Sequence, residues 1–494
     1  MSNNASYLNI FKTTLLFGFV QVFKAVISII KNKFVAILIG PEGMGLLGIF
    51  NSTLQVIQTG AGLGINQSAV RDVAEANGQG NSQRVSRIIS ITNRIVLFTG
   101  ALGCIITLIL SKNISEWTLG NTEHTVAYCI LSIVVALNII NEGKQAILKG
   151  MRKLRHLAYA SVLGTGVSLF TAVTLYYFFG VDGIVPELLI ASIIAVSVSQ
   201  YYLRKIPVES TKISLKELFI SASPMIRMGT ALMFVTFLQT IISFVINSYI
   251  RYKGGLVDVG LFSAGNYILT GYFAMIATAL MTDYYPRIAS VNNDNKMIQD
   301  ELNKQSLVTV ILCCPLIVLF IALMSLFIEV LYSSDFLPAI EYLRVGIFWT
   351  IITLCSNQID MILVAKYNTK IFILISVVLR IVQLLLCILL YDAFGLMGLG
   401  ISYAILGVLH MLVMVIVVGR LYDIYLSKEC IRVALTVLFM SIIATLANLI
   451  DNDLIKYTIE VILILSALLY SNYQSKNKLN LDFIQILKSK LNKK

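Results

Sequence analysis

The stretch Leu396–Gly419, LMGLGISYAILGVLHMLVMVIVVG, decides the fold class of this chain. It contains no Asp, Glu, Lys or Arg side chain. At ~1.5 Å per residue, a helix of this length is about 36 Å long. It can therefore cross the ~30 Å hydrocarbon core of a bilayer. The stretch is typical of a transmembrane helix.

Similar apolar stretches recur along the whole chain. Of its 494 residues, 57% are hydrophobic and 13% are charged, whereas a soluble chain is about 25% charged. Hydropathy predicts fourteen spans: 11–38, 44–66, 88–110, 124–141, 157–179, 184–203, 228–250, 259–283, 306–331, 345–364, 371–391, 396–419, 433–450 and 454–474. Without the short last pair the count is twelve, with the same orientation. The sequence predicts an all-α polytopic membrane protein.

The distribution of positive charge predicts the orientation. With a cytoplasmic N-terminus, 28 of the 38 Lys and Arg residues lie on the inner side and five on the outer side. Because inner loops are enriched in Lys and Arg, both termini are predicted to be cytoplasmic. The basic clusters lack interleaved aromatic residues on a polar face, so the net charge of +12 does not indicate a nucleic acid partner. The basic tail from 479 onward fits either a helix on the membrane surface or a solvated segment.

An internal repeat organises the predicted spans. Gly45-Leu46-Leu47 matches Gly260-Leu261-Phe262, and 179–184 matches 394–399, with the same offset in residue number at both places. We predict an N-terminal six-helix lobe (1–205), a cytoplasmic linker (206–227), a second six-helix lobe (228–420), and an extra helical hairpin with a basic tail (421–494). Transporters built from such repeats bind substrate between the halves, near the midplane.

Polar side chains at helical spacing follow four of the predicted spans. They comprise Gln21, Lys24, Ser28 and Lys31; Asn51, Gln55 and Gln58; Thr236, Gln239, Thr240, Ser243 and Asn247; and Ser263, Asn266 and Thr270. Polar residues are costly in lipid, so these stripes favour a substrate cavity. The alternative is hydrogen bonding between neighbouring helices, at about 0.6 kcal/mol each.

Single charged residues within the predicted spans are the strongest candidates for functional residues. Lys24 lies deep in the first span and fits either a site for an anionic substrate or a buried ion pair. Arg380 and Asp360 lie on neighbouring spans. They fit either an ion pair that stabilises the second lobe or a role in transport or proton coupling. Glu142, near the inner face, fits a topological or gating role.

Several kinds of chemistry find no support. The sequence has no GxxxxGK[ST] motif, and its three histidines and seven cysteines form no metal-spaced cluster. We therefore expect no cofactor and no metal, and energy from a gradient or a partner. The short outer loops disfavour a membrane-embedded polysaccharide polymerase. His410 fits a hydrogen-bonded core residue better than a proton relay.

Three segments resemble those of a known family. They are KNKFVAILIGPEGMG at 31–45, AILKGMR at 146–152 and LYSSDF at 331–336. They are similar to the Wzx-type flippases for O-antigen and enterobacterial common antigen, members of the multidrug/oligosaccharidyl-lipid/polysaccharide exporter superfamily. The resemblance covers about residues 10–420. The family commonly has twelve spans, so the pair at 433–474 departs from its pattern.

The resemblance implies a function. It implies alternating access and an undecaprenyl-pyrophosphate-linked oligosaccharide as cargo, moved from the inner to the outer leaflet of the bacterial inner membrane. A polysaccharide polymerase and a chain-length regulator are its implied partners, and Lys24 and Lys31 match the family's cationic cavity residues. A cation-coupled multidrug exporter of the same superfamily is the alternative, although its cavity would be expected to be negative.

Overall fold

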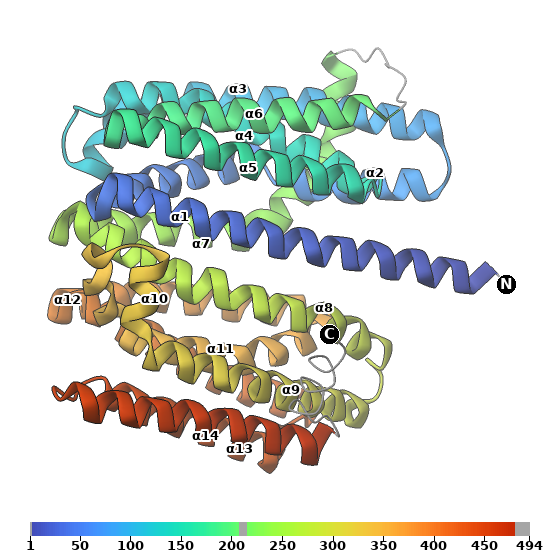
Figure 1. Cartoon of the computed structure of the whole chain (residues 1–494). Helices are drawn as coiled ribbons and strands as arrows, with labels where there is room; N and C mark the ends of the chain where they lie inside the picture. Colours follow the sequence, from blue (N-terminus) through green and yellow to red (C-terminus); the bar gives the residue numbers. More distant parts are fainter. Residues whose placement is uncertain (1, 207–214, 480–494) are drawn as a thin grey trace, which may run out of the picture. The chain divides into compact units, whose positions relative to one another are not determined.

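The computed structural model describes residues 2–206 and 215–479, and this part of the chain is helical with no strand (Figure 1). The predicted tail from 480 onward and the linker residues 207–214 lie outside it. The helices are α1 (Ser2–Gly62), α2 (Ile65–Gly78), α3 (Ser82–Leu119), α4 (Thr125–Gly150), α5 (Leu154–Phe179), α6 (Ile184–Arg204), α7 (Leu215–Asn266), α8 (Phe273–Ser290), α9 (Asn295–Ala322), α10 (Met324–Leu331), α11 (Ile340–Ala365), α12 (Thr369–Tyr422), α13 (Lys428–Ala447) and α14 (Asp453–Leu479). Short 3-10 turns cover Gly180–Gly183 and Ser334–Ala339, and a π-helical turn covers Tyr267–Tyr272. The prediction of an all-α fold is confirmed.

Ten helical segments in the described part are long and apolar enough to cross a membrane. Four of them, Phe23–Gly62, Arg155–Arg204, Ile220–Tyr272 and Thr369–Tyr422, contain a break in the helix. Each break falls between two spans that the sequence predicts separately. The chain is therefore a multi-span membrane protein, and the count of fourteen spans stays a prediction.

Glycine accounts for all four breaks. Gly40 (φ 62°, ψ −173°) and Gly255 (φ 82°, ψ −175°) share one backbone conformation. Gly180 (φ 55°, ψ −130°) and Gly395 (φ 58°, ψ −139°) share another. These positive φ values are accessible to glycine at little cost, because glycine has no Cβ. Both pairs have the same separation in the chain as the sequence matches of the predicted repeat.

The described chain forms two compact units. Unit 1 comprises the residues up to Ser263 with Leu331–Asp335, and unit 2 comprises Ala264–Val330 with the residues from Phe336 onward. In unit 1, α3 packs on α4, and α5 packs on both α1 and α6. Most of α7 belongs to unit 1, whereas the sequence assigns its predicted spans to the second lobe. Close main-chain contacts between α1 and α7, described below, account for this difference.

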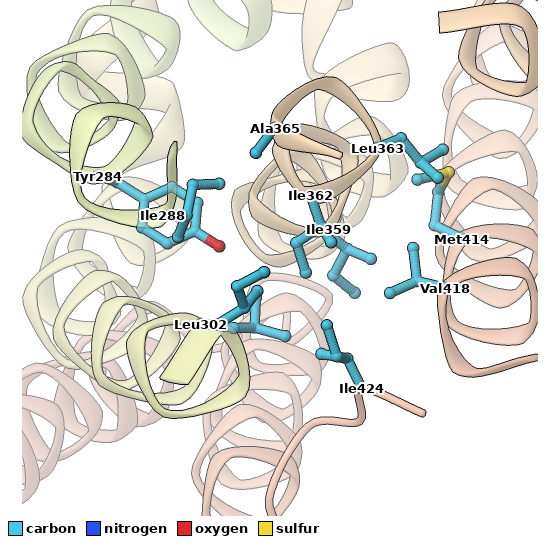
Figure 2. Close-up of a cluster of buried hydrophobic side chains, with 11 residues drawn as sticks. Tyr284, Ile288, Leu302, Ile359, Ile362, Leu363, Ala365, Met414, Val418 and Ile424 are labelled. Carbon is cyan, nitrogen blue, oxygen red and sulfur yellow. The ribbon is translucent and has the colours of Figure 1, made fainter. Parts of the chain in front are cut away.

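Unit 2 is built around α9 and α11. α11 packs against α12, and α9 packs against α11, α13 and α14. Figure 2 shows one apolar cluster of this unit, in which α8, α9, α11 and α12 each contribute buried side chains. Tyr284 of α8 lies at its edge and donates a hydrogen bond to the Gln358 carbonyl oxygen (3.2 Å). The cluster fixes the packing of these four helices.

A buried polar network joins α9 to α11. The Gln358 side chain accepts a hydrogen bond from Ser306 Oγ (2.6 Å) and donates to Thr309 Oγ1 (2.8 Å) and to the Leu354 carbonyl oxygen (3.0 Å). Gln358, Ser306 and Thr309 are all buried. Because these groups are buried, each depends on the others for its hydrogen bonds. This pairing matches the helix-to-helix role that amide side chains commonly have in membrane bundles.

Candidate functional site: a polar cavity in unit 1

Unit 1 contains a cavity of about 310 Å³ with a polar lining. α1, α4 and α7 supply its walls. The lining residues are Gln55, Gln58, Thr59, Glu142, Thr236, Gln239, Thr240 and Ser243. All eight side chains carry an amide, hydroxyl or carboxylate group, which is costly in lipid unless it faces water, protein or a polar ligand.

The sequence places these groups together because they recur at helical spacing. Gln58 and Thr59 follow Gln55 by three and four residues on α1, and Ser243 follows Gln239 by four residues on α7. Residues at such spacings share one face of a helix. Each stripe therefore presents its polar groups along a single line toward the cavity.

Glycines allow the main chain of α7 to come close to the segment that contains α1. These glycines lie before and after the cavity-lining residues along the chain. A methyl group added at Gly45 would lie 1.9 Å from the main-chain oxygen of Leu256, and one added at Gly260 would lie 1.9 Å from that of Pro41. In the turn between α1 and α2, a methyl group at Gly64 would lie 2.1 Å from the main-chain oxygen of Gly229 on α7. No side chain fits at these positions, so glycine is required for the helices to approach this closely.

A second cavity of about 150 Å³ adjoins the first and shares Gln58, Thr59, Glu142 and Thr236 with it. Glu142 is the one titratable residue that lines either cavity in the described part of the chain. Its carboxylate accepts a hydrogen bond from Asn66 Nδ2 of α2 (2.8 Å). A carboxylate at this position can receive a proton or attract a cation.

Lys24 also belongs to unit 1, but it does not line either cavity. It is partly buried on α1. Lys149 of α4 interacts electrostatically with both Lys24 and Glu142. Lys149 therefore acts on both Lys24 and Glu142, and the formal charges of the three groups sum to +1. In the described part of the chain, Lys24 forms no ion pair with a carboxylate.

Lys31 has a different environment. Its Nζ donates to Glu187 Oε1 (2.9 Å) and to Ser168 Oγ (2.7 Å). The Glu187 side chain is 2% exposed and also accepts a hydrogen bond from Tyr176 (3.3 Å). The pair joins α1 to the α5–α6 hairpin. Its geometry is that of a partly buried structural ion pair.

Comparison with known proteins places the chain in a family. The family model described as "Polysaccharide biosynthesis protein" matches residues 34–341, more than half of the chain. This chain belongs to the polysaccharide biosynthesis protein family. It is 24% identical over 432 residues to the putative O-antigen transporter of Shigella flexneri, covering 83% of this chain and 97% of that protein. It is 23% identical over 156 residues to the lipid III flippase of Escherichia coli (strain K12), covering 32% of this chain and 37% of that protein.

Solved structures show that this polysaccharide biosynthesis protein has the fold of a known transporter superfamily. The lipid II flippase MurJ in an inward closed conformation matches with a TM-score of 0.72 at 16% identity, covering 95% of this chain and 100% of that chain. An inward-facing multidrug resistance MATE family transporter of the MOP superfamily matches with a TM-score of 0.67 at 17% identity, covering 81% of this chain and 96% of that chain. Together with the family match and the relatives named as a putative O-antigen transporter and a lipid III flippase, this fold confirms the predicted membership of the multidrug/oligosaccharidyl-lipid/polysaccharide exporter superfamily.

The structure brings six residues of the predicted polar stripes into the cavity of this family member: Gln55, Gln58, Thr236, Gln239, Thr240 and Ser243. Gln55 and Gln239 line it, whereas Asn51, which is exposed, and Asn247, which is partly buried, do not. The Gln21 side chain lies outside the described part of the structure. Asn51 and Asn247 are thus the two residues of the stripes at 51–58 and 236–247 that do not line the cavity.

The remaining predicted residues lie in unit 2. Asn266 Oδ1 accepts a hydrogen bond from Tyr342 (3.5 Å). Arg380 donates to Gln383 Oε1 on its own helix (2.7 Å), and Asp360 Oδ1 lies 3.1 Å from His410 Nε2.

The sequence left open whether Arg380 and Asp360 form an ion pair. In the described part of the chain they have different partners. Arg380 donates to Gln383, one turn further along α12. Asp360 of α11 instead lies next to His410 of α12. Ser356, one turn from Asp360 on α11, contacts the other ring nitrogen of His410 (3.1 Å). His410 of α12 is therefore hydrogen-bonded to Ser356 of α11 and lies beside Asp360, in agreement with its predicted core role.

Sequence reasoning missed the position of two carboxylates. It gave Glu142 only a topological or gating role, and it did not single out Glu187. Both are isolated acidic residues within apolar helices, and that isolation is the signal that could have identified them. Their partners, Asn66 and Lys31, lie 76 and 156 residues away in the sequence and could not be predicted from it.

Proposed function

We propose that this protein is a flippase, not an enzyme, that moves an undecaprenyl-pyrophosphate-linked oligosaccharide repeat unit from the inner to the outer leaflet of the bacterial inner membrane. Its family, together with relatives named as an O-antigen transporter and a lipid III flippase, supports a lipid-linked saccharide as cargo. Both termini are cytoplasmic in this proposal. A polymerase and a chain-length regulator are its proposed partners.

The observation that carries the proposal is the polar cavity of unit 1. Seven of its eight lining residues carry neutral amide or hydroxyl groups. Such groups both donate and accept hydrogen bonds, as the hydroxyls of a sugar require. A sugar crossing hydrocarbon would otherwise lose its hydrogen bonds with water at a cost of several kcal/mol. The cavity replaces some of these bonds while the prenyl tail stays in lipid.

Lys24 and Lys149 are the proposed attraction for the pyrophosphate. Their formal charges exceed that of Glu142, so an anionic group approaching them meets a net positive charge. Lys31 is omitted from this proposed site, because Glu187 already neutralises it. Asn51, Asn247, Asn266, Arg380 and Asp360 remain proposed cavity residues for other stages of the transport cycle.

Alternating access between two six-helix lobes is the proposed mechanism. The paired glycine breaks, Gly40 with Gly255 and Gly180 with Gly395, share one offset and support the repeat on which the lobes rest. We propose the lobe boundaries 1–205 and 228–420, with 206–227 as the linker.

The test of this function is flipping in reconstituted vesicles. A fluorescently labelled undecaprenyl-pyrophosphate saccharide should reach the opposite leaflet in the presence of the protein. Gln55→Leu/Gln239→Leu should slow flipping about tenfold or more, since two cavity amides are lost. Gln83→Leu, on an exposed position of α3, is the matched control and should leave the rate unchanged. Equal rates with and without protein would overturn the proposal.

A cation-coupled multidrug exporter is the second candidate, and Glu142 favours it. This carboxylate is the sole titratable residue of the cavity lining that the structure describes, and a cationic drug would be attracted to it. Rhodamine-type dyes test this alternative. Dye binding that depends on Glu142 and is lost in Glu142→Gln, without any saccharide flipping by the wild type, would favour drug export.

A further inference from the structure

α13 presents an open recess to its surroundings in unit 2. Its volume is about 480 Å³. It is lined by Lys428, Ile431, Arg432, Leu435, Thr436 and Phe439. These positions follow the three- and four-residue spacing of one helix face, so two cations at the start of the helix lead into an apolar strip.

A crevice of about 200 Å³ adjoins this recess and shares Ile431 and Leu435 with it. It lies between α13 and the helices α9, α11 and α12. Its walls are almost entirely apolar and include Val310, Ile351 and Met411. The crevice extends the exposed strip into the interior of unit 2, with a shape and chemistry suited to a hydrocarbon chain.

The two cations at the rim, Lys428 and Arg432, form no ion pair among the described residues, and both are exposed. Glu429, which lies between them in sequence, is paired with Lys478 of α14 (2.7 Å). Its charge also acts on Arg432, but the lysine already neutralises it. A mobile anion in the membrane can therefore reach both rim cations.

The length of the strip matches one leaflet. Lys428 and Phe439 are eleven residues apart, which corresponds to about 16 Å along a helix. Half of a ~30 Å hydrocarbon core is about 15 Å. A phospholipid with its phosphate at Lys428 and Arg432 would thus extend its acyl chains as far as Phe439.

We propose that this recess and crevice bind an anionic phospholipid of the bilayer. Its phosphate contacts Lys428 and Arg432, one acyl chain lies along α13, and the other enters the crevice. Basic pockets between transmembrane helices are established sites for anionic lipid head groups. The cargo's prenyl chain is a poorer fit, because it is much longer than the one-leaflet strip. This site is independent of the proposed flippase function.

Quenching by brominated lipids tests the proposal at the site itself. The reporter is Phe439→Trp in a Trp117→Phe/Trp349→Phe background, reconstituted in nanodiscs. Brominated phosphatidylglycerol should quench the introduced tryptophan with about tenfold or greater preference over brominated phosphatidylcholine at low salt. The preference should fall as salt is added, since exposed charges are screened.

Two pairs of charge substitutions separate the site from a general surface effect. Lys428→Gln/Arg432→Gln should remove the preference, while Lys296→Gln/Lys370→Gln, which changes the net charge equally at exposed positions elsewhere in unit 2, should keep it. Equal quenching by both lipids in the reporter protein would overturn the proposal, as would a preference that survives Lys428→Gln/Arg432→Gln. Relief of the quenching by equimolar undecaprenyl pyrophosphate would assign the recess to the cargo and would also overturn it.

Discussion

Replacing Lys31 by alanine should destabilise the protein, because it leaves Glu187 as a buried charge without its cation. The Glu187 side chain is 2% exposed, whereas that of Lys31 is 24% exposed. Removing one partner of a buried ion pair costs about 3–5 kcal/mol. Glu187 would keep the hydrogen bonds from Ser168 and Tyr176. We therefore expect a loss of about 2–3 kcal/mol for Lys31→Ala.

The unequal burial of the two partners predicts an asymmetry. In Glu187→Gln, the lysine is left without its anion but can extend toward water, so the loss should be smaller than in Lys31→Ala. In Lys31→Met/Glu187→Gln no charge remains buried, and most of the stability should return. Replacing both partners of a buried pair is often nearly neutral.

Thermal unfolding of the purified protein in detergent measures these differences. At about 2 °C per kcal/mol for a large chain, Lys31→Ala should lower the melting temperature by about 5 °C. Lys24→Ala is the matched control, because Lys24 has no carboxylate partner in the described structure. It should leave the melting temperature unchanged and reduce flipping. A Lys31→Ala protein with unchanged melting and lost flipping would refute the reasoning and return Lys31 to the substrate site.

The packing and the charge distribution lead to three further predictions. Gly45→Ala should lower the free energy of unfolding by about 3 kcal/mol, because the added methyl group would lie 1.9 Å from a main-chain oxygen of α7. Gly78→Ala is the control and should have no effect, because there is open space around Gly78. The melting temperatures of the two variants test this. Gln358→Ala should cost about 2 kcal/mol in unfolding free energy, since three side-chain hydrogen bonds at about 0.6 kcal/mol each are lost; an unchanged denaturation midpoint would contradict the network. A cysteine in place of Glu116 should react with an impermeant thiol reagent from outside intact cells and one in place of Gln79 should not; the reverse pattern would overturn the orientation.

Hydropathy predicted the fold class because lipid allows few solutions. Backbone groups in hydrocarbon must be bonded internally, so long apolar stretches become helices. Hydropathy could not predict that α7 packs with unit 1. That arrangement depends on main-chain contacts at Gly45 and Gly260, and hydropathy carries no information about contacts between distant helices.

The candidate site was predictable in part for a similar reason. Helical spacing identified the polar faces of α1 and α7, and therefore Gln55 and Gln239. Spacing within one helix says nothing about which other helix faces it. Glu142 entered the cavity from α4, and Glu187 paired with Lys31 from α6, through tertiary packing alone.

The motifs that indicated a repeat also lie where α1 and α7 touch. Gly45 meets the main-chain oxygen of Leu256, and Gly260 meets that of Pro41. The separation of the two glycines in the chain equals the separation of their partners, Pro41 and Leu256. Each segment therefore makes the same contact with the other: its glycine meets the main-chain oxygen four residues before the other glycine. A contact of this kind excludes any side chain at either glycine. If the predicted repeat is real, this contact explains why the sequence shows it at Gly45 and Gly260, where the main chains meet and only glycine fits.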